Sequence, residues 1–92
     1  MARLSAQELA DGLSRLEGWA AEGDAIGKTY QFADFVAAMA FVNRVADLAE
    51  AAGHHPDIDI RYGRVVIGLS THDEGGVTDK DAALAAQIDA AV

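Results

Sequence analysis

The chain contains no cysteine, only one proline, and fewer than half as many basic as acidic residues. Without cysteine it cannot form disulfides, use a thiolate nucleophile or build a cysteine-type zinc site. Seven Lys and Arg against 15 Asp and Glu give a formal charge of −8, so phosphate backbones are repelled and we expect no direct nucleic-acid binding. No hydrophobic run approaches a membrane span, and "MARLSAQEL" has no apolar signal core. These absences predict a cytoplasmic protein that does not enter a membrane.

What the chain does have is enough apolar sequence for one small core. Its 92 residues suit a single domain over 1–92, and hydrophobic residues make up 51%, too many for a disordered tail. Much of that fraction is alanine, which buries little area per residue. Because a core of this size gains from burial shared between copies, we expect self-association.

The first half of the chain predicts a helix, a hairpin and a long second helix. "SAQE" at 5–8 is typical of a capping box and begins a helix over about 5–16. Residues 19–30 have a loosely extended pattern, with a turn at Gly23-Asp24. Apolar residues at helical spacing predict a helix over about 33–51. Its main apolar stripe is Phe32, Phe35, Val36, Met39, Val42, Ala46 and Ala49, and a second apolar face, suited to a helix from another copy, is Phe41, Val45 and Leu48.

Two strands follow the long helix. Ile58, Ile60 and Tyr62 share one face of the first strand, and Gly63 suits a tight turn. "RVVIGLS" at 64–70 is rich in β-branched residues and predicts a more buried strand.

The last element is a helix that "TDKD" at 78–81 begins with a capping pattern. We expect its inner face to contain Leu84, Ala85, Ile88 and Val92. The order α-β-β-α-β-β-α predicts an α+β fold, a four-stranded antiparallel sheet with three helices packed on one face.

All three histidines fall at corresponding ends of the last two predicted strands. His54 and His55 precede the first of these strands, and His72 follows the second. Because an antiparallel hairpin places the start of one strand beside the end of the other, the three imidazoles should gather at one rim of the sheet. Imidazoles titrate near neutral pH, so such a cluster indicates acid/base chemistry.

Pro56 and Glu50 add detail to this rim. A residue before proline favours an extended backbone, so the side chains of His54 and His55 should diverge and approach a ligand from different directions. Glu50 lies four residues before His54, and we expect its carboxylate to interact with that imidazole and suit it for donating a proton.

Simpler readings stay open at these positions. His54 alone could be a solvated residue after a helix end, and Asp81 could serve only as a helix cap. Trp19 could be a core residue. The histidines and nearby carboxylates could also bind zinc, although histidine ligands on a helix usually lie four residues apart, whereas adjacent histidines point apart.

The sequence resembles the pterin-4a-carbinolamine dehydratases, also known as dimerisation cofactors of a homeodomain transcription factor. "THDEGGVTDKD" is similar to a family signature over its whole length, and Gly18-Trp19 and "FADF" at 32–35 also match. The residues that carry the resemblance are Glu50, His54, His55, Pro56, Tyr62, His72 and Asp81.

The resemblance implies an enzyme that dehydrates 4a-hydroxytetrahydropterin to quinonoid dihydropterin, without metal or organic cofactor. It implies His54, His55 and His72 as the catalytic residues. We expect His54 to handle the hydroxyl proton, His72 the N5 side, and His55 to position the hydroxyl. The supporting or substrate-binding residues would be Glu50, Pro56, Trp19, Ile58, Ser70, Thr71 and Asp81.

The resemblance also implies which proteins this chain associates with. It implies a homodimer or homotetramer, with sheets joined edge to edge and dimers paired through the long helices. An aromatic amino-acid hydroxylase in the same pathway would be a functional partner. The alternative is a non-catalytic module that keeps the fold and assists the assembly of other proteins. Ile58 stands where the family often has an aromatic residue, which predicts weaker stacking on a pterin.

Overall fold

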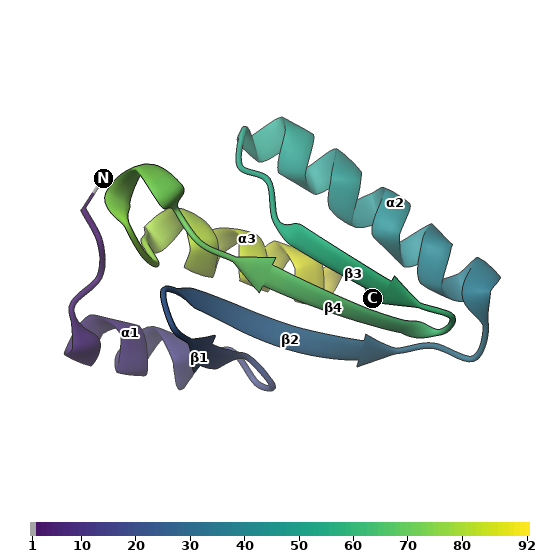
Figure 1. Ribbon diagram of the computed structural model, residues 1–92, viewed down its shortest axis with the longest axis horizontal. Coiled ribbons are helices and arrows are strands. Elements are labelled where there is room, and N and C mark those ends of the chain that lie inside the picture. Colours follow the sequence, from purple (N-terminus) through teal and green to yellow (C-terminus); the bar gives the residue numbers. More distant parts are fainter. Residues whose placement is uncertain (1) are drawn as a thin grey trace.

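The computed structural model describes residues 2–92 and has the predicted order of elements (Figure 1). A short 3-10 turn, η1 (His72–Glu74), follows the last strand. The helices are α1 (Ala6–Leu13), α2 (Phe35–Ala52) and α3 (Asp79–Ala90), and the strands are β1 (Ala20–Glu22), β2 (Ala25–Gln31), β3 (Asp57–Arg61) and β4 (Arg64–Leu69). The α+β prediction is therefore confirmed.

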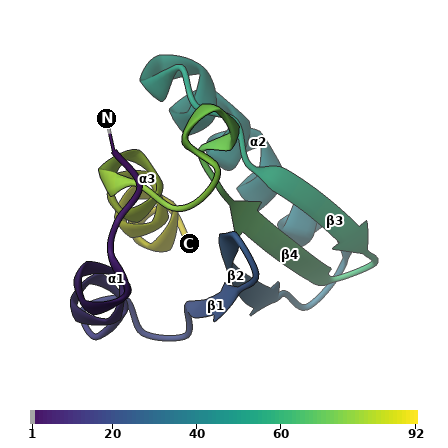
Figure 2. The same ribbon diagram turned by 60° about the vertical axis from the view of Figure 1, so that its left-hand side comes forward.

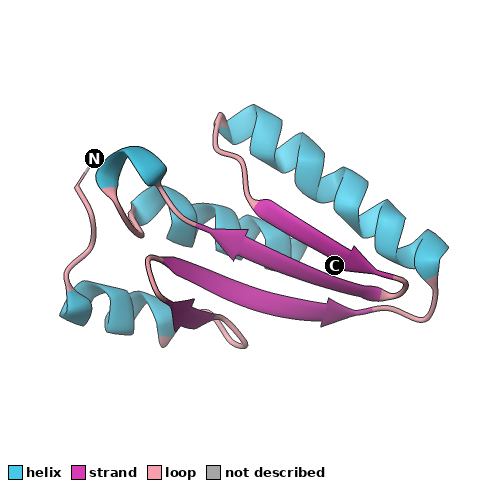
Figure 3. Cartoon of the chain, in the orientation of Figure 1, coloured by secondary structure: helices cyan, strands magenta, loops and turns pink. Residues whose placement is uncertain are grey.

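The four strands form one antiparallel sheet in the order β1-β2-β4-β3. Side chains alternate across β4, so Val65, Ile67 and Leu69 are buried while Val66 between them is only half-buried. The helices cover the buried face, as Figure 2 shows from the side and Figure 3 by element type. Within residues 2–92 no helix is long and apolar enough to cross a membrane.

Helix α1 is shorter than predicted. The capping box at Ser5 is present, because its hydroxyl accepts from the Glu8 backbone and the Glu8 carboxylate accepts from the Ser5 backbone. The helix ends at Leu13 rather than near residue 16, and Leu16 enters the core from the turn beyond it.

Helix α2 faces the core with a different stripe from the main one predicted. Ala38, Phe41, Val45 and Ala49 are buried at spacings of three and four, the pattern of a helix that packs one face on the core. Within the predicted main stripe, only Ala49 is buried, and Phe35 and Val36 are exposed by 49% and 77%. The proposed second face is thus largely the real core face.

The turn between β3 and β4 differs from the prediction at Tyr62. Instead of extending the strand, Tyr62 adopts a left-handed backbone with φ of 52° and is exposed by 69%. Gly63 next to it packs so closely on the Phe32 carbonyl that an added Cβ would come within 2.5 Å of that oxygen. Any residue larger than glycine at position 63 would therefore clash with the Phe32 backbone.

Helix α3 begins as predicted, with Thr78 and Asp81 forming a capping box. Its inner face of Leu84, Ala85 and Ile88 is buried, which confirms that prediction, whereas Val92 is 66% exposed and lies past the helix.

The other end of α3 is fastened by Asp89. Its carboxylate accepts from Trp19 Nε1 at 3.1 Å, from Lys28 Nζ at 2.8 Å and from the Tyr30 hydroxyl. Burial alone would raise the pKa of the Asp89 carboxyl, but the bonds from Lys28, Tyr30 and Trp19 outweigh it and hold the pKa below its usual range. Burial, and then the bond to Asp89, raises the pKa of Tyr30, so this hydroxyl stays a donor.

Candidate functional site

The structure brings the three histidines together around one hollow of about 260 Å³. It lies where the α2–β3 connection meets the segment after β4, two regions that Figure 1 shows at the same end of the hairpin. The residues that line it are Gly53, His54, His55, Ser70, Thr71, His72, Asp73 and Lys80.

The antiparallel register explains this gathering. Asp57 at the start of β3 pairs with Gly68 near the end of β4, so residues just before Asp57 meet residues just after Leu69. A small loop then presents His72. Thr71 pairs with Gly76 across it, and the Gly75 backbone donates to the His72 carbonyl.

The backbone conformation at the end of α2 sets the directions of the His54 and His55 side chains. Gly53 takes a left-handed conformation with φ of 63°, and the backbone N–H of His54 donates to the Ala49 carbonyl at 3.1 Å. This cap reverses the chain, so that His54 turns toward α3 and His55 lies on the outer side.

His54 is bonded to a carboxylate that is fully buried. Its Nε2 lies 2.5 Å from Asp81 Oδ1, and the His54 side chain is itself only 12% exposed. The other oxygen of Asp81 accepts from the Thr71 hydroxyl at 2.8 Å and from the Thr78 backbone at 2.9 Å. Among residues 2–92, no buried side-chain nitrogen or oxygen is left without a hydrogen-bond partner. Asp81 thus caps α3 and orients His54 at once.

Glu50 pairs with His55, which corrects the expected Glu50–His54 interaction. Glu50 Oε2 lies 2.5 Å from His55 Nε2, and the two side chains are 78% and 64% exposed. A spacing of four residues suggested contact with His54, but the left-handed Gly53 ends the helix between them and swings His54 away.

Other predicted site residues lie outside the hollow. Trp19 was expected to form part of its wall, but it is 5% exposed in the core and donates to Asp89. Ile58 packs against the core cluster from β3, and Pro56 is half-buried next to the hollow without lining it. In the single chain, neither Trp19 nor Ile58 covers the histidines.

Three lining residues were missed as site candidates. Lys80 lies in the first turn of α3 and Gly53 ends α2, and both line the hollow. Lys80 could have been found from the sequence, because "TDKD" places it directly before Asp81, which was a site candidate. Asp73, in the short turn η1, is the third residue of this kind that lines the hollow.

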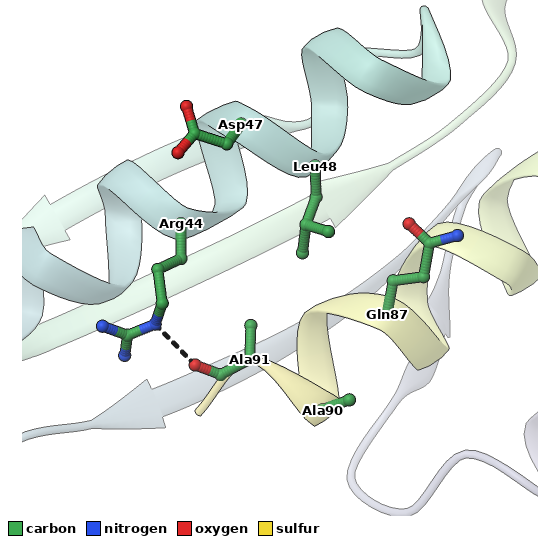
Figure 4. A pocket seen from close by; sticks show the side chains of 6 residues that line it. All are labelled: Arg44, Asp47, Leu48, Gln87, Ala90 and Ala91. Carbon is green, nitrogen blue, oxygen red and sulfur yellow. Dashed lines mark hydrogen bonds between the residues drawn. The ribbon is translucent and has the colours of Figure 1, made fainter.

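A second hollow, of about 520 Å³, lies between α2 and α3 (Figure 4). Its wall is made of Arg44, Asp47, Leu48, Gln87, Ala90 and Ala91, and Arg44 Nε donates to the Ala91 carbonyl at 2.7 Å. Because none of these residues is a histidine, this larger hollow offers no imidazole for proton transfer at neutral pH.

The side chains of residues 2–92 form no group of three or more His, Asp or Glu that could hold a metal ion. The site's titratable groups are instead joined in pairs, His54 with Asp81 and His55 with Glu50. Cofactor-free chemistry remains a prediction that metal analysis of purified protein can test.

Residues 2–91 match the family model described as pterin 4 alpha carbinolamine dehydratase. A Chloroflexus aurantiacus protein is 58% identical over 89 residues, covering 97% of this chain and 96% of its own. An Acidobacterium capsulatum protein is 54% identical over 90 residues, covering 98% of each. The names of both assign pterin-4-alpha-carbinolamine dehydratase activity only provisionally. This small α+β protein with a histidine rim therefore belongs to the pterin 4 alpha carbinolamine dehydratase family.

Solved structures agree with this membership. A crystal structure from Brucella melitensis, described as a transcriptional coactivator/pterin dehydratase, superposes with a TM-score of 0.94 at 36% identity and 97% coverage of both chains. A pterin dehydratase-like protein identified as a RuBisCO assembly factor in the alpha-carboxysome gives a TM-score of 0.67 at 26% identity, covering 79% of this chain and 84% of its own. The assembly role is described for that second relative.

Proposed function

We infer that the chain is a dehydratase of 4a-hydroxytetrahydropterins, acting through histidine acid/base catalysis in tetrahydropterin recycling. The observation that carries this proposal is the meeting of three histidines at one hollow, with His54 bonded to the buried carboxylate of Asp81. Family membership supports the substrate class.

The reaction requires two proton movements, which imidazoles can perform. The hydroxyl on C4a leaves as water when an acid gives it a proton, and a base takes the proton from N5. The electron pair of the N5–H bond then forms the C4a=N5 double bond, so atoms and charge balance. Positioned acid and base groups are each typically worth about 10²–10⁴-fold in rate.

The proposed roles follow the positions of the imidazoles. His54 gives its proton to the hydroxyl from Nδ1, because its Nε2 is held by Asp81. His72 stands on the opposite segment and takes the N5 proton. His55 positions the hydroxyl, with its own Nε2 held by Glu50. The backbone of Ser70 would meet the ring edge of the pterin, whereas the N–H and carbonyl of Thr71 are already bonded within the His72 loop.

The proposal also covers the compartment, the partner protein, the cofactor requirement and the oligomeric state. The chain works in the cytoplasm beside an aromatic amino-acid hydroxylase, needs no cofactor, and forms a homodimer or homotetramer. Phe35 and Val36, exposed on α2, support assembly because a partner copy would remove this apolar surface from water.

A coupled assay tests the activity, with a hydroxylase generating the 4a-hydroxy intermediate and the protein added in catalytic amounts. We expect faster loss of the intermediate, and a rate lowered by about 10²-fold or more in His54→Ala and His72→Ala. The folded fraction should change little in His72→Ala, because that side chain is exposed. His54→Ala also removes a donor from the buried Asp81, so its rate is expressed per folded molecule. Folded wild-type protein that does not accelerate the step would overturn the proposal.

A second candidate function is that of a non-catalytic assembly module. The relative identified as a RuBisCO assembly factor favours it, as does the exposed apolar start of α2. Capture of a specific partner by wild-type protein and equally by His54→Ala, with no dehydration by either, would favour this second function over the first.

A further inference from the structure

We propose that Thr71 is a positioning residue that couples the two histidine-bearing segments, orienting His54 through Asp81 by its hydroxyl and holding the His72 turn by its backbone. The effect on catalysis rests on the proposed dehydratase function. The structural part, a fixed His54 ring, can be tested without any substrate.

The hydrogen bonds around Thr71 have a single consistent direction. The Thr71 hydroxyl donates to Asp81 Oδ2 at 2.8 Å. Since that hydroxyl has only one proton, its 2.8 Å contact with the Thr78 hydroxyl must be a bond that Thr78 donates. The Thr78 oxygen in turn accepts from the Lys80 backbone at 3.3 Å. Every group in the chain from Lys80 to Asp81 is therefore satisfied.

Thr71 helps to fix the Asp81 carboxylate in the orientation that sets the His54 tautomer. With Asp81 Oδ2 taken by Thr71 and the Thr78 backbone, Oδ1 is the oxygen left for His54 Nε2. A carboxylate only accepts, so Nε2 carries a proton and Nδ1 is the nitrogen that can exchange a proton with a ligand. Asp81 and Thr78 are both fully buried, which shields these bonds from competing water.

The backbone of Thr71 fixes the other histidine. Its N–H donates to the Gly76 carbonyl at 2.9 Å, and its carbonyl accepts from Glu74 at 3.0 Å. These bonds close the loop that begins with His72. Thr71 therefore joins the segment carrying His72 to the carboxylate that holds His54.

The only proton of the Thr71 hydroxyl is engaged within the protein. The hydroxyl donates to Asp81 and accepts from Thr78, so donating to a substrate would break the internal bond to Asp81. This separates its role from that of a substrate contact, for which a rise in KM would be the expected sign of removal.

The experiment compares Thr71→Val, which keeps the shape and removes the hydroxyl, with Thr71→Ser, which keeps the hydroxyl. Thr29→Val on the exposed side of β2 is the matched control. We expect Thr71→Val to lower kcat by about tenfold with KM within about twofold, a fraction of the 10²–10⁴-fold worth of a positioned acid. Thr71→Ser and Thr29→Val should keep the wild-type kcat.

The second measurement is the nitrogen NMR spectrum of the His54 ring in substrate-free protein, at a pH where the imidazole is neutral. Wild type and Thr71→Ser should show one tautomer, protonated at Nε2, and Thr71→Val a mixture. Should Thr71→Val not fold, Thr71→Cys, with a weaker donor, should give intermediate values of both quantities.

The outcomes separate the two proposals. An inactive wild type with a single His54 tautomer that Thr71→Val disturbs rejects the dehydratase function and keeps the positioning role. Unchanged kcat and tautomer in Thr71→Val, or equal losses in Thr71→Ser, overturn the positioning role.

Discussion

Each end of α3 carries a carboxylate that accepts hydrogen bonds from several donors, but the two sets of donors differ in their chemistry. At its start, the buried Asp81 accepts from His54, Thr71 and the Thr78 backbone. At its end, Asp89 accepts from Trp19, Lys28 and Tyr30. Each carboxylate receives three donors. All three donors to Asp89 are distant in the sequence, whereas Asp81 receives two from other segments and one from the cap of its own helix.

The difference lies in what the donors can do. The donors to Asp89 hold their protons at neutral pH, and a raised pKa reinforces this for Tyr30. One donor to Asp81 is an imidazole that lines a hollow, and its second nitrogen is free to exchange protons. A buried carboxylate with several donors is therefore no sign of chemistry by itself. The decisive feature is a titratable donor that also reaches a cavity.

The largest expected effect is on rate. Asp81→Asn should lower kcat by about 10²–10⁴-fold, because an amide has one acceptor oxygen and must present its NH₂ to one side of the network. With that NH₂ toward His54, the proton on the ring moves to Nδ1. Asp89→Asn should leave kcat within about twofold, measured per folded molecule in the dehydration assay. Equal losses in both variants would show that the two ends do not differ in function.

The second-largest expected effect is the loss of stability in Asp89→Asn. Asp89→Asn should lower the free energy of unfolding at neutral pH by about 2 kcal/mol, the usual worth of bonds to a charged group, because Lys28 loses its ionic partner. Urea unfolding measures this change.

The unfolding free energies of wild type and Asp89→Asn should depend differently on pH. A lowered folded-state pKa means that the Asp89 contribution is fully present well above the ordinary pKa of 3.8 and is lost as pH falls through the folded-state pKa. The stability gap between wild type and Asp89→Asn should therefore be constant near neutral pH and close in strong acid. A gap that does not shrink at all as the solution is made more acidic would mean that the charge of Asp89 is not its cause.

The smallest effect is expected at the exposed pair. Glu50→Gln should change kcat by less than about fivefold, because an exposed ion pair is worth about 1 kcal/mol or less. Raising the salt concentration should shrink the difference further. A loss as large as that of Asp81→Asn would instead make His55 and Glu50 the dominant pair.

The sequence predicted the element order and the gathering of the histidines, because both follow from local patterns. Strand alternation, capping boxes and helical spacing depend on neighbouring residues, and the antiparallel hairpin then places "HHP" beside "THD". Asp81 was assigned to cap α3 and support the site, and its two oxygens divide between those tasks.

Features that depend on direction at a chain reversal or on distant partners were not predictable. The backbone at Gly53 sends His54 to Asp81, 27 residues away, which no local spacing encodes. On α2, both faces carry apolar residues at helical spacing, and only packing against the sheet selects Phe41 and Val45. Asp89 gave no signal, since an acidic residue in the last turn of a helix normally faces water.

Because Asp81 and Asp89 both lie on α3, the organisation of residues made earlier depends on a segment made after them. His54, His72 and the core residues of the sheet all leave the ribosome before Asp81 and Asp89. Until α3 is in place, Trp19 and Tyr30 have no carboxylate to accept their hydrogen bonds, and the His54 ring is not held by Asp81. A chain without α3 would therefore leave part of the apolar sheet face uncovered and the histidines unorganised.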